Sequence, residues 1–227
     1  MTTDRNAAPA PLPRRILQTF VAPRELFRSF GEHAPWLGPL AISAVVAALV
    51  FLVTPREVFV EMMEGATTRR GKPVTITSDP ETIAKYGRLL GMFSTLVMEP
   101  VMMFMVAGVL ALVFTGLLRG EGSYRQYLAI TTHTSLISSL GVLLAIGLAA
   151  LRGGDPESIS PALLFPGGPG GVAYRILSGL DVFNLWTLVV TGLGVSMVNR
   201  RRSWASAAGV LVGVYLLAVV AVAFLIP

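Results

Sequence analysis

Five long apolar stretches constrain the fold of this chain more than any other feature of the sequence. They run over about residues 36–53, 91–118, 126–151, 179–198 and 204–226. A helix needs about 20 residues to cross a bilayer core of about 30 Å, so the first stretch is slightly short and the second is long. We expect the second to tilt, to bend at Pro100 or to project beyond the bilayer. The predicted fold class is all-α: a polytopic membrane protein with a bundle of five transmembrane helices.

The composition supports this class and excludes several others. Of the 227 residues, 53% are apolar and only 14% are charged, whereas a soluble domain has about 25% charged residues. The mean hydropathy is +0.68. The chain has no cysteine, which excludes disulfides, thiolate metal sites and iron–sulfur clusters. The net charge of +5 comes from loops between the apolar stretches, so we expect no nucleic-acid partner.

Outside the spans, the sequence predicts a tail, two amphipathic helices and two loops. Residues 1–13 are rich in alanine and proline and are expected to be a disordered tail; one membrane domain then covers residues 14–227. Short segments beginning at Pro23 and Pro55 place proline in the first helical turn and apolar side chains on one face. We predict that both lie in the membrane interface. Glycine and proline favour exposed loops in the regions 65–80 and 152–175.

The distribution of basic residues predicts the orientation in the membrane. Ten Lys and Arg residues fall on the side of the N-terminal tail and eight on the other side. Arg200, Arg201 and Arg202 are consecutive in one very short loop, where the positive-inside rule acts most strongly. We therefore predict an inside N-terminus and an outside C-terminus, with anionic lipid headgroups as partners of the basic inner face.

Glu99 is the most informative polar residue because it lies within the second apolar stretch. The apolar side chains of that stretch favour insertion by about 4–8 kcal/mol, which exceeds the roughly 2.5–3.5 kcal/mol cost of a central charge. At 1.5 Å per residue, Glu99 lies about 12 Å from the start of its apolar stretch and Asn184 about 7 Å from the start of its own, and both stretches start on the same side. The sequence therefore predicts one polar cluster of Glu99, Asp181 and Asn184.

A second polar layer is predicted around His133, which enters the membrane from the opposite side together with Thr131 and Ser135. Two interpretations of these layers stay open. Intramembrane ionisable groups commonly mark a proton, ion or substrate path, but polar side chains also hold helices together through hydrogen bonds. We favour the structural interpretation, because Glu99 has no intramembrane base at its depth and His133 has no companion metal ligands.

Small residues spaced by four predict close contacts between helices. They are Ala205, Gly209 and Gly213 in the last stretch, and Gly192 and Ser196 in the fourth. We expect them to pack within the chain; a homodimer face is the alternative. The sequence contains no phosphate-binding loop, no serine–histidine–acid arrangement and no zinc-protease motif. We therefore expect no enzyme activity, no cofactor and no metal.

Several local motifs resemble those of the Yip1-domain family. They are Ala-Pro-Arg-Glu-Leu-Phe at 22–27, Pro-Trp-Leu-Gly-Pro-Leu at 35–40, Arg-Gly-Glu-Gly-Ser-Tyr-Arg-Gln at 119–126, Asp-Val-Phe-Asn-Leu-Trp at 181–186 and Gly-Leu-Gly at 192–194. The resemblance implies a non-enzymatic five-span domain of the bacterial type with a cytosolic N-terminus. Eukaryotic relatives are associated with Rab GTPases and vesicle traffic. That role is not carried over, because the Asp-Leu-Tyr-Gly-Pro motif of their N-terminal region is missing here.

The leading functional hypothesis is a membrane-organising module of the bacterial cytoplasmic (inner) membrane, with lipids, a membrane protein or a second copy as partner. The alternative is a small permease or channel component that uses Glu99, Asp181 and Asn184 on one side and His133 on the other. A continuous cavity joining the two polar layers would favour transport, and a tightly packed bundle would favour the membrane-organising module.

Overall fold

The structure is a computed structural model that describes residues 9–31, 34–54, 79–152, 158–165, 171–199 and 201–225. These ranges are all-helical, as the sequence predicts. Within them a π-helical segment, Leu112–Leu117, continues α5, and a 3-10 helix, Pro161–Leu164, precedes α7. The α-helices are α1 (Leu12–Val21), α2 (Pro23–Arg28), α3 (Leu37–Val53), α5 (Pro80–Ala111), α6 (Tyr124–Arg152), α7 (Gly171–Gly179), α8 (Val182–Val198) and α9 (Trp204–Leu225).

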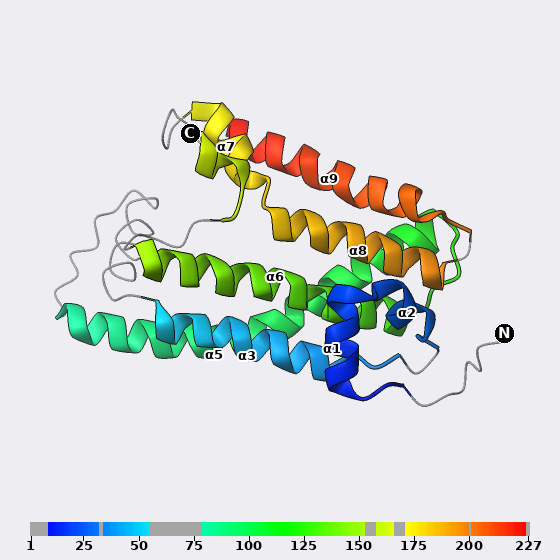
Figure 1. Ribbon diagram of the computed structural model, residues 1–227, viewed down its shortest axis with the longest axis horizontal. Coiled ribbons are helices and arrows are strands. Elements are labelled where there is room, and N and C mark those ends of the chain that lie inside the picture. Colours follow the sequence, from blue (N-terminus) through cyan, green and yellow to red (C-terminus); the bar gives the residue numbers. More distant parts are fainter. Residues whose placement is uncertain are drawn as a thin grey trace.

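The long helices lie side by side, and α6 is at the centre of the bundle (Figure 1). It contacts α3 and α5 on one side and α8 on the other, and α9 packs against α8. The helices α1 and α2 cross the bundle near one end, where the α8–α9 turn and the α5–α6 connection also lie. Phe27, Phe114, Tyr127 and Ile130, which are among the largest fully buried side chains, lie at this end.

Membrane-spanning capacity is confirmed for most of the predicted stretches. Three segments of the described chain are long and apolar enough to cross a bilayer: Ala84–Leu117, Tyr124–Ala149 and Trp204–Leu225. The helices α7 and α8, bent by 47° at the break between them, make a fourth segment if they are taken together. The helix α3 matches the first stretch but has only 17 residues, the shortness already visible in the sequence.

The helix α5 begins earlier than the apolar pattern predicts. Asp79 accepts a hydrogen bond from the Thr82 backbone N–H (3.3 Å), and Pro80 occupies the first helical position. A capping side chain followed by proline is a strong helix start, so the helix forms from residue 80, ahead of the apolar stretch that begins at about residue 91. It continues through Pro100 and extends past the end of α3 at the left of Figure 1.

The first two helices form a hairpin that is docked on the bundle. The helix α1 begins at Leu12, within the segment expected to be a tail; residues 1–8 lie outside the described residues. Leu26, Phe27 and Phe30 of the α2 region are buried against protein, which differs from the predicted contact with lipid. The second predicted amphipathic segment, beginning at Pro55, lies outside the described residues.

Candidate functional site

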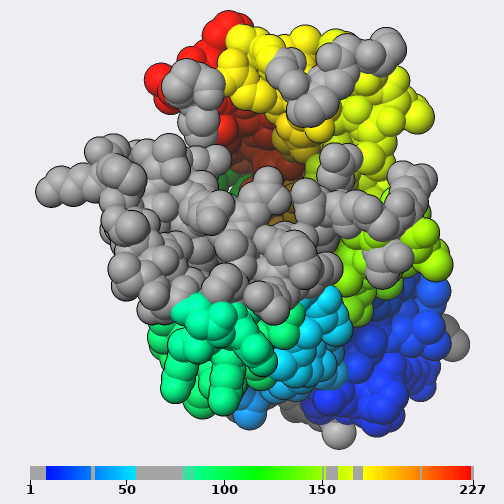
Figure 2. Space-filling model, turned by 90° about the vertical axis from the view of Figure 1, so that its left-hand side faces the viewer, coloured from blue at the N-terminus to red at the C-terminus, as the bar shows by residue number. Residues whose placement is uncertain are grey.

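A cavity of about 540 Å³ lies between α3, α5, α6 and α8. Figure 2 looks at the end where α5 begins, with α3 and α5 at the bottom of the view and the C-terminal end of α9, in red, at the top. Apolar side chains such as Val50, Met103 and Val142 form most of the lining. The polar lining residues are Thr95, Glu99, Thr131, Thr134, Ser135, Ser138, Ser139, Thr187 and Thr191. We refer to this space below as the central cavity.

One wall of the central cavity is a face of α5. Thr95, Glu99 and Met103 recur every four residues and therefore share one face of the helix. Glu99 is half-buried, and no hydrogen bond or ion pair joins its carboxyl group to another of the described residues. The wall thus carries one acidic group and one hydroxyl group among apolar side chains.

The facing wall consists of paired hydroxyl groups on α6 and α8. The Ser138 and Thr187 hydroxyls are 2.9 Å apart, and the Thr191 hydroxyl donates to the Thr134 hydroxyl at 3.0 Å. Each hydroxyl has one donor and two acceptor lone pairs, so a paired hydroxyl can still accept a hydrogen bond from a ligand. We call these four residues the hydroxyl wall.

The structure does not bring Glu99 together with Asp181 and Asn184. Asp181 caps α8 by accepting a hydrogen bond from the Asn184 backbone N–H (2.8 Å), and neither residue lines the central cavity. Since α5 begins at Pro80, Glu99 lies about 28 Å along its helix. It faces the hydroxyl wall, deeper in the bundle than the first turn of α8. The depth predicted for Glu99 was measured from residue 91, where the apolar stretch begins, and the helix itself begins at Pro80.

The predicted second layer divides between two surroundings. Thr131 and Ser135 line the central cavity with Glu99. His133 is fully buried on another face of α6, where its Nδ1 lies 2.7 Å from the Ala129 carbonyl. A ring nitrogen beside a carbonyl must donate, so Nε2 is left as an acceptor. His133 is therefore hydrogen-bonded within the protein and does not line the central cavity.

Arg15 of α1 supplies the donor for that acceptor. Its Nη1 lies 3.4 Å from His133 Nε2 and the same distance from the Pro35 carbonyl, and its Nε donates to the Ala10 carbonyl at 2.9 Å. Only 9% of Arg15 is exposed, and burial lowers the pKa of its guanidinium. This contact fastens the N-terminal hairpin to α6.

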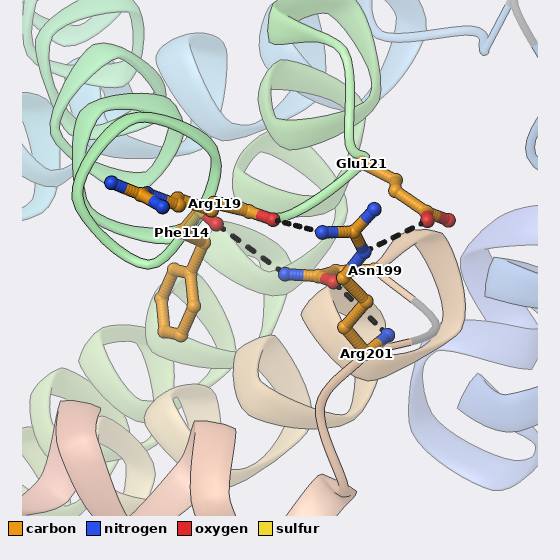
Figure 3. Close-up of polar contacts among 5 residues, drawn as sticks. All are labelled: Phe114, Arg119, Glu121, Asn199 and Arg201. Atoms are coloured by element: carbon orange, nitrogen blue, oxygen red, sulfur yellow. Dashed lines mark hydrogen bonds and ion pairs between the residues drawn. The ribbon is translucent and has the colours of Figure 1, made fainter.

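A second polar joint, drawn in Figure 3, closes the same end of the bundle. The fully buried Asn199 at the end of α8 donates to the Phe114 carbonyl of the π-helical segment (3.4 Å) and accepts from the Arg201 backbone N–H (3.2 Å). Arg201 also donates to the Glu121 carboxylate and to the Arg119 carbonyl. These contacts join the α5–α6 connection to the α8–α9 turn, and we call them the loop joint.

Gly120 shows how closely the loop joint is packed. A methyl group added at Gly120 would lie 2.1 Å from Asn199 Nδ2 and 2.3 Å from the Phe114 carbonyl oxygen. Arg119, just before it, has a left-handed backbone with φ of 52°. The joint therefore requires glycine at residue 120 because no side-chain volume is available there.

The small residues have different surroundings on α8 and on α9. At Gly192 an added methyl would lie 2.5 Å from the Ala208 Cα, so the backbones of α8 and α9 approach closely at this residue. Ser196 is buried and its hydroxyl donates to the Leu193 carbonyl. In contrast, nothing lies within 4 Å of a methyl built on Gly209 or Gly213, and Ala205 is exposed. We call Ala205, Gly209 and Gly213 the α9 stripe. This stripe does not pack closely against any of the described residues.

Several residues of these sites were not singled out from the sequence: Thr95, Thr187 and Thr191 of the central cavity, and Arg15, Gly120 and Asn199 of the closed end. A spacing of four, from Thr95 to Glu99 and from Thr187 to Thr191, was the available signal for the cavity residues. Within the described ranges, no group of three or more His, Asp or Glu side chains forms a possible metal site.

Comparison with known proteins gives two matches. A family model described as the Yip1 domain matches residues 17–225. The chain is also similar to the membrane protein YknW of Bacillus subtilis (strain 168), with 22% identity over 214 residues, which cover 90% of this chain and 88% of YknW. No solved structure matches.

Proposed function

The chain belongs to the Yip1 domain family, and from this premise we propose that it is a non-enzymatic module of the bacterial cytoplasmic membrane that binds anionic lipids and a membrane partner. The end of the bundle closed by α1, α2 and the loop joint is its binding face. The comparisons support a multi-pass membrane protein with a bacterial relative. Two surface features support the binding roles: the basic side chains at this end for lipids, and the small residues of α9 for a membrane partner.

The observation that carries this proposal is a group of basic side chains on the described segments that close one end of the bundle. Two acidic residues, Glu25 and Glu121, lie in the same segments. The arginines there, which we call the basic end, are Arg14, Arg24, Arg28, Arg119, Arg125, Arg201 and Arg202. Each Lys or Arg near a membrane surface attracts anionic headgroups by about 1 kcal/mol. We place the basic end, and with it the N-terminus, on the cytoplasmic side, and the C-terminus outside.

A lipid-retention experiment tests this role. The protein is purified from a membrane containing equal amounts of phosphatidylglycerol and phosphatidylcholine, and the lipids that remain bound are measured by mass spectrometry. Arg28→Gln removes one basic side chain from this face. It should therefore reduce the amount of retained phosphatidylglycerol about fivefold. Lys85→Gln, on an exposed residue at the start of α5, is the matched control and should have little effect. Equal retention in Arg28→Gln and wild type would contradict the proposal.

The unpacked α9 stripe supports a second copy of the chain as the membrane partner. Ala205, Gly209 and Gly213 leave a smooth surface of the kind on which helices associate closely in membranes. In a dilution experiment with fluorescently labelled chains, Gly209→Ile should lower energy transfer between copies. Energy transfer that is absent in wild type, or unchanged in Gly209→Ile, would exclude this face as a dimer contact.

The absence of catalysis is also part of the proposal. His133 is held between a backbone carbonyl and the Arg15 guanidinium, so neither ring nitrogen is free to activate a hydroxyl. A hydrolase assay on generic ester and phosphoester substrates should show no activity that depends on His133. Loss of such an activity in His133→Gln would contradict a non-enzymatic role.

The central cavity favours a small permease or channel component as a second candidate function. It joins Glu99 of one predicted polar layer to Thr131 and Ser135 of the other in one space, although the remaining predicted residues of these layers do not line it. Flux of small cations into proteoliposomes tests this candidate. Flux that disappears in Glu99→Gln would support it, and flux no greater than in protein-free vesicles would contradict it.

A further inference from the structure

The central cavity combines features that point to a particular class of ligand. Its volume of about 540 Å³ falls in the range of small-molecule sites, which are mostly apolar with a few polar groups that set orientation. Val46, Val50, Phe51 and Met103 provide the apolar surface. The cavity could therefore enclose a short hydrocarbon chain, and its polar groups would select the head of that molecule.

The ionisable lining of the central cavity is acidic. Glu99 is the acidic lining residue, and no Lys, Arg or His is among the described residues that line the space. Charges removed from water are stable only when they are paired. None of the described residues forms an ion pair or a hydrogen bond with the Glu99 carboxyl group. A positively charged ligand would provide this partner.

The remaining polar groups are arranged to accept hydrogen bonds. Thr95 lies one helical turn before Glu99 on α5, and the hydroxyl wall faces it from α6 and α8. An ammonium group has three donors and no acceptor. The carboxylate and the free lone pairs of the hydroxyls match this pattern, whereas a phosphate or carboxylate head would be repelled by Glu99.

We propose that the central cavity is a binding site for a primary alkylammonium ion, whose ammonium group donates to Glu99 and whose chain lies against Val50, Phe51 and Met103. The inference uses the cavity of the permease candidate but does not require transport, because it concerns occupancy at equilibrium. It is independent of lipid binding at the basic end. Glu99 determines the preference for a cation, and the apolar lining determines the length of chain that fits.

Equilibrium binding of octylammonium and of octanol to the full chain in phosphatidylcholine nanodiscs tests the proposal, with empty nanodiscs as the blank. Octylammonium should bind wild type saturably. Glu99→Gln should weaken this binding by about tenfold or more, since a charge-assisted contact is lost, and should leave octanol binding unchanged. Glu81→Gln, in the exposed first turn of α5, is the matched control and should bind octylammonium as wild type does.

A second variant fills the cavity without changing its charge. Ser139 lines the central cavity, and Ser139→Leu should weaken both octylammonium and octanol. Equal octylammonium affinity in Glu99→Gln and wild type, absence of saturable binding, or unchanged binding in Ser139→Leu would overturn the proposal. Saturable, Glu99-dependent binding without flux would support this site and contradict the permease candidate.

Discussion

The closed end of the bundle and the central cavity treat buried polar groups in opposite ways. At the closed end, Asn199, Arg15 and His133 each have partners, and their contacts join segments far apart in sequence. In the central cavity, the Glu99 carboxyl has no partner among the described residues, although it faces the hydroxyl wall. The two regions share α6, which carries His133 at the closed end and Ser138 in the cavity wall.

This difference distinguishes polar groups that stabilise the fold from polar groups that are free to bind a ligand. Buried polar groups are costly unless they are hydrogen-bonded, so a fully paired set around Asn199 is explained by the stability of the fold alone. An unpaired carboxyl beside a cavity contributes no such stability. We infer that the closed end holds the bundle together, and that the central cavity is the part able to accept a ligand.

The largest effect is expected from adding one methyl group at the closed end. Gly120→Ala should lower the free energy of unfolding by about 3 kcal/mol, because the methyl would overlap Asn199 and the Phe114 carbonyl. Gly209→Ala, where nothing lies within 4 Å, should not lower it, and the better helix propensity of alanine should raise it by up to about 1 kcal/mol. Unfolding in mixed micelles titrated with a denaturing detergent measures both. Equal stability of the two variants would contradict the tight packing of the loop joint.

Removal of the central amide of the loop joint should have the next largest effect. Asn199→Ala leaves the Phe114 carbonyl without this donor and should lower the free energy of unfolding by about 2 kcal/mol. Asn184→Ala is the matched control, because Asn184 is exposed and its contact with Ser138 is long, at 3.5 Å. If the control were the more destabilised protein, the contrast between the two regions would be lost.

A smaller and more local effect is expected where α1 is attached. Arg15→Met keeps an unbranched stem in place of the arginine methylenes but removes the donors to His133, Ala10 and Pro35. The free energy that protects α1 should fall by about 1.5 kcal/mol, measured as faster hydrogen exchange of the α1 backbone amides. Arg14→Met, on the exposed neighbour, should leave exchange unchanged. Unaltered exchange in Arg15→Met would show that the hairpin is held by apolar contacts alone.

The smallest effect is expected within the hydroxyl wall. A double-mutant cycle with Thr134→Val and Thr191→Val should give a coupling energy of about 0.6 kcal/mol, the average for hydrogen bonds between membrane helices. Such a weak coupling is consistent with hydroxyls that can change partner when a ligand enters. A coupling above about 2 kcal/mol would assign these hydroxyls to structure instead.

The fold class could be predicted from the sequence because long apolar runs have few alternatives to membrane helices. The starts of α8 and α9, near Asp181 and Trp204, were also placed well by the apolar pattern. The helix α1 was not predicted, although Leu12, Ile16 and Phe20 recur every four residues. Its buried face includes Arg15 and Thr19, and polar residues in a tertiary contact resemble an exposed segment when only the sequence is available.

The site was predicted in part. Sequence reasoning identified Glu99, Thr131 and Ser135, which share the central cavity. It also grouped Glu99 with Asp181 and Asn184, because hydropathy locates the apolar part of α5 and not its capped start at Pro80. The partner of His133 could not be predicted, because Arg15 is 118 residues away and reaches it only through the docking of α1.

The central claim is that the cavity beside Glu99 is open while the closed end is sealed, and cysteine reactivity tests it most directly. The chain has no native cysteine, so Ser139→Cys and Thr132→Cys each give a single thiol, the first lining the cavity and the second at a fully buried residue. Ser139→Cys should react with aminoethyl methanethiosulfonate, and more slowly when combined with Glu99→Gln, while Thr132→Cys stays unmodified. A Ser139→Cys thiol as unreactive as that of Thr132→Cys would contradict the account.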